Sequence, residues 1–175
     1  GNGCPVCAGK QIIPGENDLA SQFPQLAAQW HPDKNGALRP ENVSPNSNRK
    51  VWWLCPLGHA WKATVTSRSR EGAGCPFCAG RKVCPGFNDL ETVEPKVAAQ
   101  WHPTLNGQLT PRMVTAGSRR KVWWQCPEGH VWKAVVYSRA GKRKCGCPVC
   151  AGRISEARMK AYRHMVGEQQ GKTER

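Results

Sequence analysis

The sequence predicts a small α+β fold that is repeated in tandem and stabilised by metal ions, with a helix after the second repeat. Three observations predict it. The phrase KVWWLCPLGHAWKA at 50–63 returns as KVWWQCPEGHVWKA at 121–134. In each copy a Cys-x-x-x-His pair is followed by a Cys-x-x-Cys pair. Each copy spans about seventy residues, a length at which the apolar core alone rarely gives enough stability.

The repeat divides the chain into four segments. Residues 1–10 are expected to be the remnant of a preceding repeat, because their CPVCAG has the form that ends both complete repeats. Zinc repeat 1 covers 11–81 and zinc repeat 2 covers 82–152. Residues 153–175 are expected to form a basic helical tail with Ser155 as its N-cap. We therefore expect a piece of a longer array or a processed chain.

A short helix is expected near the start of each repeat. The pairs Asn17-Asp18 and Asn88-Asp89 can cap this helix, because their side-chain oxygens accept hydrogen bonds from the first free N–H groups. The helix contains PQLAAQW at 24–30 or PKVAAQW at 95–101, where an aliphatic residue and a tryptophan lie one turn apart. It should end before the proline of the following His-Pro. Asn-Gly turn signals and a loop then lead to the next element.

A β-hairpin with a metal knuckle at its tip is expected next. The first strand covers 50–54, and the return strand is expected over 61–68 and again over 132–139, because apolar residues alternate there with polar or basic ones. One face of each hairpin is therefore predicted to be apolar and the other basic. The adjacent Trp52 and Trp53 should point to opposite faces, and one of them either packs within its unit or offers a stacking surface.

Two ligand pairings are open in the first repeat. Its Cys-x-x-x-His pair can join the Cys-x-x-Cys pair downstream across 15 intervening residues, or Cys4 and Cys7 across 47. Loop-closure entropy favours the shorter loop by about 1 kcal/mol per site, and the return strand itself delivers the downstream pair. We therefore assign the metal ligands as Cys55, His59, Cys75 and Cys78 in repeat 1, and Cys126, His130, Cys147 and Cys150 in repeat 2.

Zinc is the expected cofactor, with two ions for the chain. Three thiolates and an imidazole complete a tetrahedral set, which leaves no position for water or substrate, so the sites are structural. Cys84 and Cys145 have no counterpart in the other repeat and are expected to be free thiols. A disulfide framework is the minority alternative, because the sequence has zinc-type spacings and no signal peptide or transmembrane run. We expect a reducing cytoplasmic setting, which includes association with the nucleoid, and no membrane partner.

The positive charge predicts a polyanionic partner such as nucleic acid. The formal charge is +14, and two zinc centres with a charge of −1 each leave +12. Five basic positions match between the repeats, whereas the helix-cap aspartates are the single acidic match. The candidate nucleic-acid-binding residues are Arg49, Lys50, Lys62, Arg68, Arg119, Arg120, Lys121, Lys133 and Arg139. The alternative is a solvated face that keeps the chain soluble.

No catalytic site is expected. A reaction needs a nucleophile, an acid–base pair or an open metal position, and none recurs in both repeats. The closest candidates are His31 and His102, for a histidine–metal nuclease, but Asp33 beside the first is matched by Thr104 beside the second. Structural hydrogen bonding is therefore the expected role of both histidines.

Together the motifs AAQWHPxxNGxL, VWWxCPxGHxWKAxVxSR and GCPxCAG resemble the tandem zinc-ribbon repeats of bacterial proteins, which are grouped with treble-clef-like zinc fingers. The likeness covers about residues 1–152. It implies a zinc-ribbon or treble-clef-like fold, the same eight ligands, and occurrence in arrays or beside nuclease-like domains. It also implies nucleic-acid binding without an activity of its own, and this likeness alone favours DNA over RNA.

Two functions follow as hypotheses. The first is a zinc-stabilised, non-catalytic nucleic-acid-binding module that contacts mainly backbone phosphates, with DNA favoured. Its affinity should fall steeply with salt, because each neutralised phosphate releases counterions. The second is a structural or protein-interaction adaptor for an acidic partner, or an accessory region of a larger nuclease-type protein.

Overall fold

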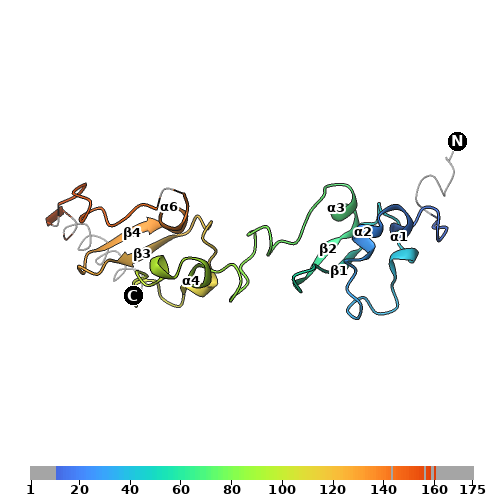
Figure 1. Cartoon of the computed structure of the whole chain (residues 1–175), viewed down its shortest axis with the longest axis horizontal. Coiled ribbons are helices and arrows are strands. Elements are labelled where there is room, and N and C mark those ends of the chain that lie inside the picture. Colours follow the sequence, from blue (N-terminus) through green and yellow to red (C-terminus); the bar gives the residue numbers. More distant parts are fainter. Residues whose placement is uncertain (1–10, 143, 156, 159, 161–175) are drawn as a thin grey trace, which may run out of the picture. The chain divides into compact units, whose positions relative to one another are not determined.

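The computed structural model describes residues 11–142, 144–155, 157, 158 and 160. The chain divides into two compact units, Gly1–Ala79 and Gly80–Arg175 (Figure 1). Within the described residues, each unit holds one two-stranded antiparallel sheet and several one-turn helices. This arrangement confirms the predicted class, a small α+β fold that occurs twice in tandem.

The two units have the same order of elements. Unit 1 contains α1 (Leu19–Gln22), α2 (Pro24–Ala27), the 3-10 helix η1 (Pro40–Asn42), β1 (Lys50–Leu54), β2 (Ala60–Thr64) and α3 (Val65–Ser69). Unit 2 contains α4 (Leu90–Val93), α5 (Pro95–Ala98), the 3-10 helix η2 (Pro111–Met113), β3 (Lys121–Gln125), β4 (Val131–Val135) and α6 (Val136–Ala140). Among the described residues, no helix has the length and apolarity that a membrane span requires.

The first helical segment of each unit is interrupted. Asp18 is the N-cap of α1, as predicted, and its carboxylate accepts a hydrogen bond from the Ser21 N–H at 2.8 Å. The prediction of one helix containing 24–30 is wrong, because α1 and α2 are separate and α2 ends before the tryptophan. Phe23 between them has φ −136° and ψ 65°, since a following proline disfavours helical backbone at the preceding residue. Glu94 separates α4 from α5 in the same way.

The hairpins display one apolar and one basic face. In unit 1, Trp52 pairs with Lys62 and Trp53 pairs with Trp61. Cross-strand partners share a face, so Trp53 and Trp61 form the inner face while Trp52 and Lys62 lie on the outer face. Trp53 is fully buried and Trp52 is partly exposed. The predicted opposite orientation of the two tryptophans is confirmed.

The return strand is shorter than the sequence pattern predicts. β2 ends at Thr64 and α3 follows at once, so the strand predicted over 61–68 is wrong in its second half. Thr64 caps the new helix, because its Oγ1 accepts a hydrogen bond from the Ser67 N–H at 3.2 Å. This single helical turn carries Arg68 to the interior instead of the outer face. In unit 2, β4 ends at Val135 and α6 takes the place of the second half, 136–139, of the strand predicted over 132–139.

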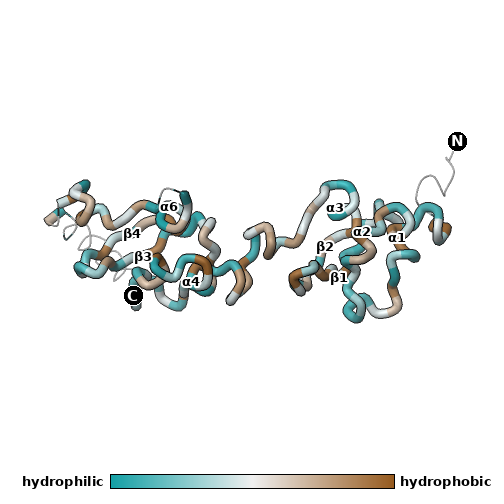
Figure 2. Tube along the Cα trace, viewed as in Figure 1, coloured by the Kyte–Doolittle hydropathy of each residue, from teal (hydrophilic) through white to brown (hydrophobic). Residues whose placement is uncertain are grey.

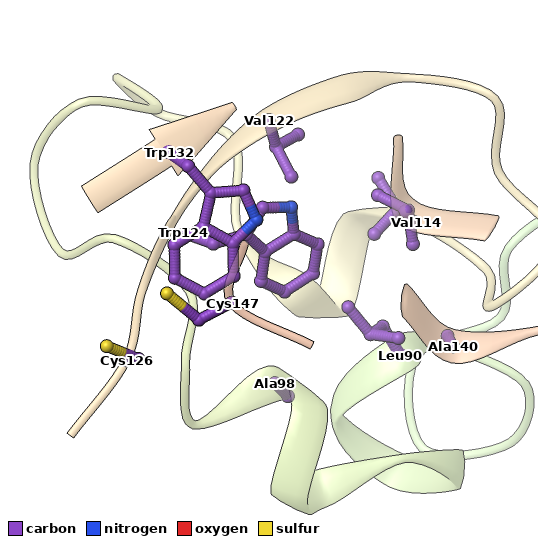
Figure 3. Packing of buried hydrophobic residues seen from close by; sticks show 10 residues of the cluster. Leu90, Ala98, Val114, Val122, Trp124, Cys126, Trp132, Ala140 and Cys147 are labelled. Carbon is purple, nitrogen blue, oxygen red and sulfur yellow. The ribbon is translucent and has the colours of Figure 1, made fainter. Parts of the chain in front are cut away.

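The core of each unit lies between the inner face of its hairpin and the short helices. In unit 2, Trp101 meets Trp124 edge to face, with ring centroids 5.3 Å apart and an interplanar angle of 78°. Figure 3 shows Trp124 and Trp132 in the middle of this cluster, with the sulfur atoms of Cys126 and Cys147 at one end. Figure 2 shows short hydrophobic and hydrophilic stretches interspersed along the chain in both units. The core is therefore small and continuous with the cysteine cluster.

Part of the predicted organisation falls outside the described residues. This applies to residues 1–10 with Cys4 and Cys7, and to residues 161–175 of the predicted helical tail. At the start of that tail, the Arg158 N–H donates a hydrogen bond to Ser155 Oγ at 3.4 Å. This is the contact expected of an N-cap serine.

Candidate metal centres

Each unit brings three cysteines and one histidine together. The ligand atoms of Cys55, His59, Cys75 and Cys78 lie within 4.8 Å of one another, and so do those of Cys126, His130, Cys147 and Cys150. In both units the Cys-x-x-x-His pair comes from the turn between the strands, and the Cys-x-x-Cys pair follows the last helix of the unit. The structure thus assembles the two ligand sets that the sequence predicts.

The distances fit a tetrahedral ion. Zinc–sulfur bonds of about 2.3 Å and zinc–nitrogen bonds of about 2.0–2.1 Å place two sulfurs about 3.8 Å apart, and sulfur and nitrogen about 3.6 Å apart. Cys55 Sγ and Cys78 Sγ are 3.8 Å apart. His59 Nδ1 lies 3.4, 3.3 and 3.8 Å from the sulfurs of Cys55, Cys78 and Cys75. In unit 2, Cys126 Sγ and Cys150 Sγ are 3.8 Å apart. His130 Nδ1 lies 3.4 and 3.3 Å from these two sulfurs. The described cysteines form no disulfide.

A tight turn holds the first two ligands of each centre. The Cys55 N–H donates to the His59 carbonyl at 3.0 Å, and the Gly58 N–H donates to the Cys55 carbonyl at 2.9 Å. Gly58 has φ +80°, a left-handed conformation that side chains disfavour. The glycine of Cys-Pro-x-Gly-His is therefore needed for the thiol and the imidazole to reach one point.

The cluster needs a cation before all three thiols can ionise together. Burial raises the pKa of Cys55, but hydrogen bonds from the backbone of His59 and Leu57 outweigh it and lower that pKa below its ordinary value. Desolvation and the neighbouring sulfurs of Cys75 and Cys55 raise the pKa of Cys78 to about 12. Cys78 therefore keeps its proton at neutral pH in the absence of metal, and a bound ion must displace that proton.

A buried arginine lies behind each centre. Arg68 is only 6% exposed. Its Nη1 donates to the Ala73 carbonyl at 2.6 Å, and its Nη2 donates to Oε1 of Gln29. The guanidinium carbon lies 5.0 and 5.1 Å from the ring centroids of Trp53 and Trp61. The cation is thus enclosed by the two tryptophans of the inner face and fixed by two hydrogen-bonded groups.

Arg68 connects the two halves of the ligand set. Ala73, whose carbonyl it binds, stands two residues before Cys75. The carbonyl of Gln29 accepts a hydrogen bond at 2.7 Å from the residue that precedes Cys55. Burial lowers the pKa of Arg68, while the charges of Cys75 and Cys55 act in the opposite direction. The thiolates therefore stabilise the buried cation, and the cation balances the negative charge of a Cys₃His–zinc centre.

Unit 2 repeats this arrangement. Arg139 donates to the Cys145 carbonyl at 3.0 Å and to the side chain of Gln100. Gln29 and Gln100 are not among the predicted site residues. The sequence does mark these glutamines, because Gln29 and Gln100 are 71 residues apart, as are the two arginines, and 71 residues is the spacing between the two repeats. Matched polar residues that bind no metal are candidates for holding the ligands in place.

The predicted nucleic-acid-binding residues divide into exposed and buried groups. Those at the surface are Arg49, Lys50, Lys62, Arg119, Arg120, Lys121 and Lys133. Arg68 and Arg139 are 6% and 4% exposed. The prediction that these two arginines contact phosphates is therefore wrong, because the helical turns of α3 and α6 direct them into the core.

The remaining histidine and cysteine candidates lie outside both clusters. His31 Nδ1 accepts hydrogen bonds from the N–H groups of Asp33 and Lys34, both at 3.3 Å. His102 Nδ1 accepts the equivalent bonds at 3.3 and 3.2 Å. Both histidines therefore stabilise a turn, as expected. Cys84 and Cys145 are free thiols and belong to neither ligand set.

A closed Cys₃His set between a hairpin and the segment after it defines a protein of the zinc-finger class, in which the ion is structural. The family described as "Probable Treble clef zinc finger domain" matches the chain at residues 26–81 and again at 97–153. These tandem matches cover more than half of the sequence, and the chain belongs to this family. Its two centres are each positioned to hold one zinc ion. No curated protein sequence matches the chain significantly.

Proposed function

We propose that this chain is a zinc-stabilised nucleic-acid-binding module that contacts mainly backbone phosphates, with DNA as the favoured partner, and that it has no catalytic activity. The observation that carries the proposal is the placement of seven exposed basic residues along the hairpins of the two units: Arg49, Lys50, Lys62, Arg119, Arg120, Lys121 and Lys133. DNA is preferred to RNA because of the family likeness alone.

The basic residues are placed for phosphate contacts. Lys50 and Lys62 share the outer face of the β1–β2 hairpin, hereafter hairpin 1, because their strand partners are Thr64 and Trp52. Lys121 and Lys133 hold the equivalent positions in unit 2. The ion pairs of Arg112 with Glu91 and of Lys144 with Glu94 use no residue of this set. The seven cations are therefore available to an external anion.

The metal centres and one surface hollow of unit 1 support binding without catalysis. Each metal centre is filled by four protein ligands, so the ion has no open position for a substrate or an activated water. A hollow of about 270 Å³ in unit 1 is lined by Ile12, Asn42, Val43, Ser44, Asn46, Ser47 and Arg49. This lining offers neither a carboxylate nor an imidazole for acid–base chemistry.

The test is a binding panel with duplex DNA, single-stranded DNA and RNA at two salt concentrations. We expect affinity to fall steeply at the higher salt, because each phosphate contact releases counterions. The double variant Lys62→Glu with Lys133→Glu should lower affinity at least about tenfold, since it removes two contacts and adds repulsion.

The matched control is Lys82→Glu with Lys142→Glu, which makes the same charge change at exposed lysines outside the set. The proposal predicts a much smaller loss for this control. Equal losses of affinity in both double variants would indicate general electrostatic attraction without defined contact residues. Absence of nucleic-acid binding by the wild-type chain would contradict the proposal. Retention of a protein partner by the first double variant would instead support the adaptor alternative.

A further inference from the structure

The outer faces of the two hairpins differ although their sequences match closely. Trp52 is partly exposed, and the ammonium groups of Lys34 and Lys62 lie 4.8 and 5.7 Å from the centroid of its ring. The equivalent tryptophan in unit 2, Trp123, is only 4% exposed. Position 105, which corresponds to Lys34, is a leucine. The combination of an accessible indole and two adjacent cations thus belongs to unit 1.

The backbone of Trp52 is held by several hydrogen bonds. Its backbone N–H donates to Oδ1 of Asn35 at 2.8 Å, and its carbonyl accepts from Nδ2 of the same side chain at 2.9 Å. The His31 N–H donates to that carbonyl at 3.1 Å, and Lys62 is the strand partner of Trp52. Lys34 directly precedes Asn35, so the contacts that fix the tryptophan also place this lysine beside it. The backbone segment that carries the indole and Lys34 is therefore already ordered before a ligand binds.

We propose that the outer face of hairpin 1 binds single-stranded nucleic acid, with a base stacked on Trp52 and flanking phosphates paired with Lys34 and Lys62. This inference rests on the proposed function and specifies its ligand. A base must leave its own stack to pack on an aromatic side chain, which a single strand permits and an intact duplex does not. The long lysine stems allow both ammonium groups to move from the indole to the phosphates.

Unit 2 differs from unit 1 in the contacts that its outer face offers to a nucleic acid. Trp123 is enclosed and presents no ring face to a base, whereas Lys121 and Lys133 stay exposed. Unit 2 therefore contributes phosphate contacts, and the preference for a single strand comes from unit 1.

The test uses the full chain with a fluorescein-labelled oligothymidine and a duplex of the same length. Trp52→Ala should weaken binding of the single strand at least about fivefold, because one base–aromatic stack is lost, and should change duplex binding by less than about twofold. Lys34→Leu installs the residue that unit 2 carries. It should weaken single-strand binding and reduce the salt slope by about one phosphate contact. Zinc content and circular dichroism of each variant establish that it is folded.

A second measurement needs no variant. Oligothymidine with 5-bromodeoxyuridine is cross-linked by light to the wild-type chain, and the adduct is located by peptide mass spectrometry. We expect the main adduct on Trp52. Adducts elsewhere, or wild-type affinity in Trp52→Ala, would overturn this site while leaving the wider proposal of nucleic-acid binding in place. Failure of the wild-type chain to bind any nucleic acid would overturn both.

Discussion

The buried arginine of each unit links the metal ligands to the core. Arg68 and Arg139 contact two tryptophans each and hydrogen-bond to a glutamine 39 residues earlier in the chain. Their Nε atoms have no hydrogen-bond partner, so the indole faces and the thiolates supply much of their stabilisation. Sequence alone identifies these arginines as matched residues but not as buried ones. The reason is that the alternation before them is equally compatible with a longer strand.

Arg68→Gln should destabilise unit 1 and its metal centre. The change leaves the Ala73 carbonyl and the Gln29 side chain without their donors and removes the cation beside the thiolates. We expect a loss of about 3 kcal/mol in the free energy of unfolding of unit 1 and faster transfer of zinc to a chelator. The matched control is Arg39→Gln, because Arg39 is exposed and hydrogen-bonds only locally, to the Gly36 carbonyl. Equal zinc-transfer rates in the two variants would refute the role assigned to Arg68.

Metal uptake should release protons at neutral pH. Cys78 and Cys150 have pKa values raised to about 12 and about 11, so both are protonated without metal and deprotonated when they bind it. The pKa in the zinc-bound state lies below that in the free state, and zinc-dependent stability is therefore lost as the pH falls. Calorimetric titration with zinc in buffers of different ionisation enthalpy should show at least one proton released per site. Uptake without proton release would be incompatible with thiolate ligation.

At the scale of the elements, the knuckle is the part that the sequence predicts best. Soft ligands at short spacing and a glycine between them leave few alternative structures, and the strands on either side fix the position of the turn. The one-turn helices are less predictable, because a helix of four or five residues depends on its surroundings rather than on propensity. The break at Phe23 follows from Pro24, but α3 lies within a run of β-branched residues.

Gly58→Ala tests the knuckle turn. Gly58 has φ +80° with open space around an added Cβ, so the cost arises from backbone conformation and not from a clash. We expect a loss of about 1 kcal/mol in the stability of unit 1 and weaker zinc retention. Gly74→Ala is the control, because Gly74 also precedes a metal ligand and has open space but no left-handed φ. Thermal unfolding that affects both variants alike would argue against a strained turn.

At the scale of the whole molecule, the two units have separate cores. The cluster of unit 1 and the cluster of unit 2 share no residue. Each cluster includes two cysteines of its own metal centre, Cys55 and Cys75 or Cys126 and Cys147. The repeat in the sequence predicts this duplication directly. The difference in exposure between Trp52 and Trp123 was not predictable from the strands that carry them, because both strands begin with the same KVWW.

Cys78→Ser should therefore affect one unit only. Cys78 is an exposed ligand, so its replacement disturbs little besides metal binding. We expect one zinc equivalent to be lost, unit 1 to unfold, and the thermal transition of unit 2 to stay within about 2 °C of the wild-type value. Cys84→Ser serves as the control, because Cys84 belongs to neither ligand set. Loss of both zinc ions in Cys78→Ser would show that the units do not fold independently.

Native mass spectrometry of the purified wild-type chain tests most directly whether each repeat is closed by one zinc ion. The structure predicts a folded species heavier than the reduced polypeptide by two zinc ions, less the protons displaced from the ligands, and a shift to unfolded charge states when a chelator removes the metal. A folded species that carries no metal, or one whose mass shows cysteines oxidised in pairs, would contradict it.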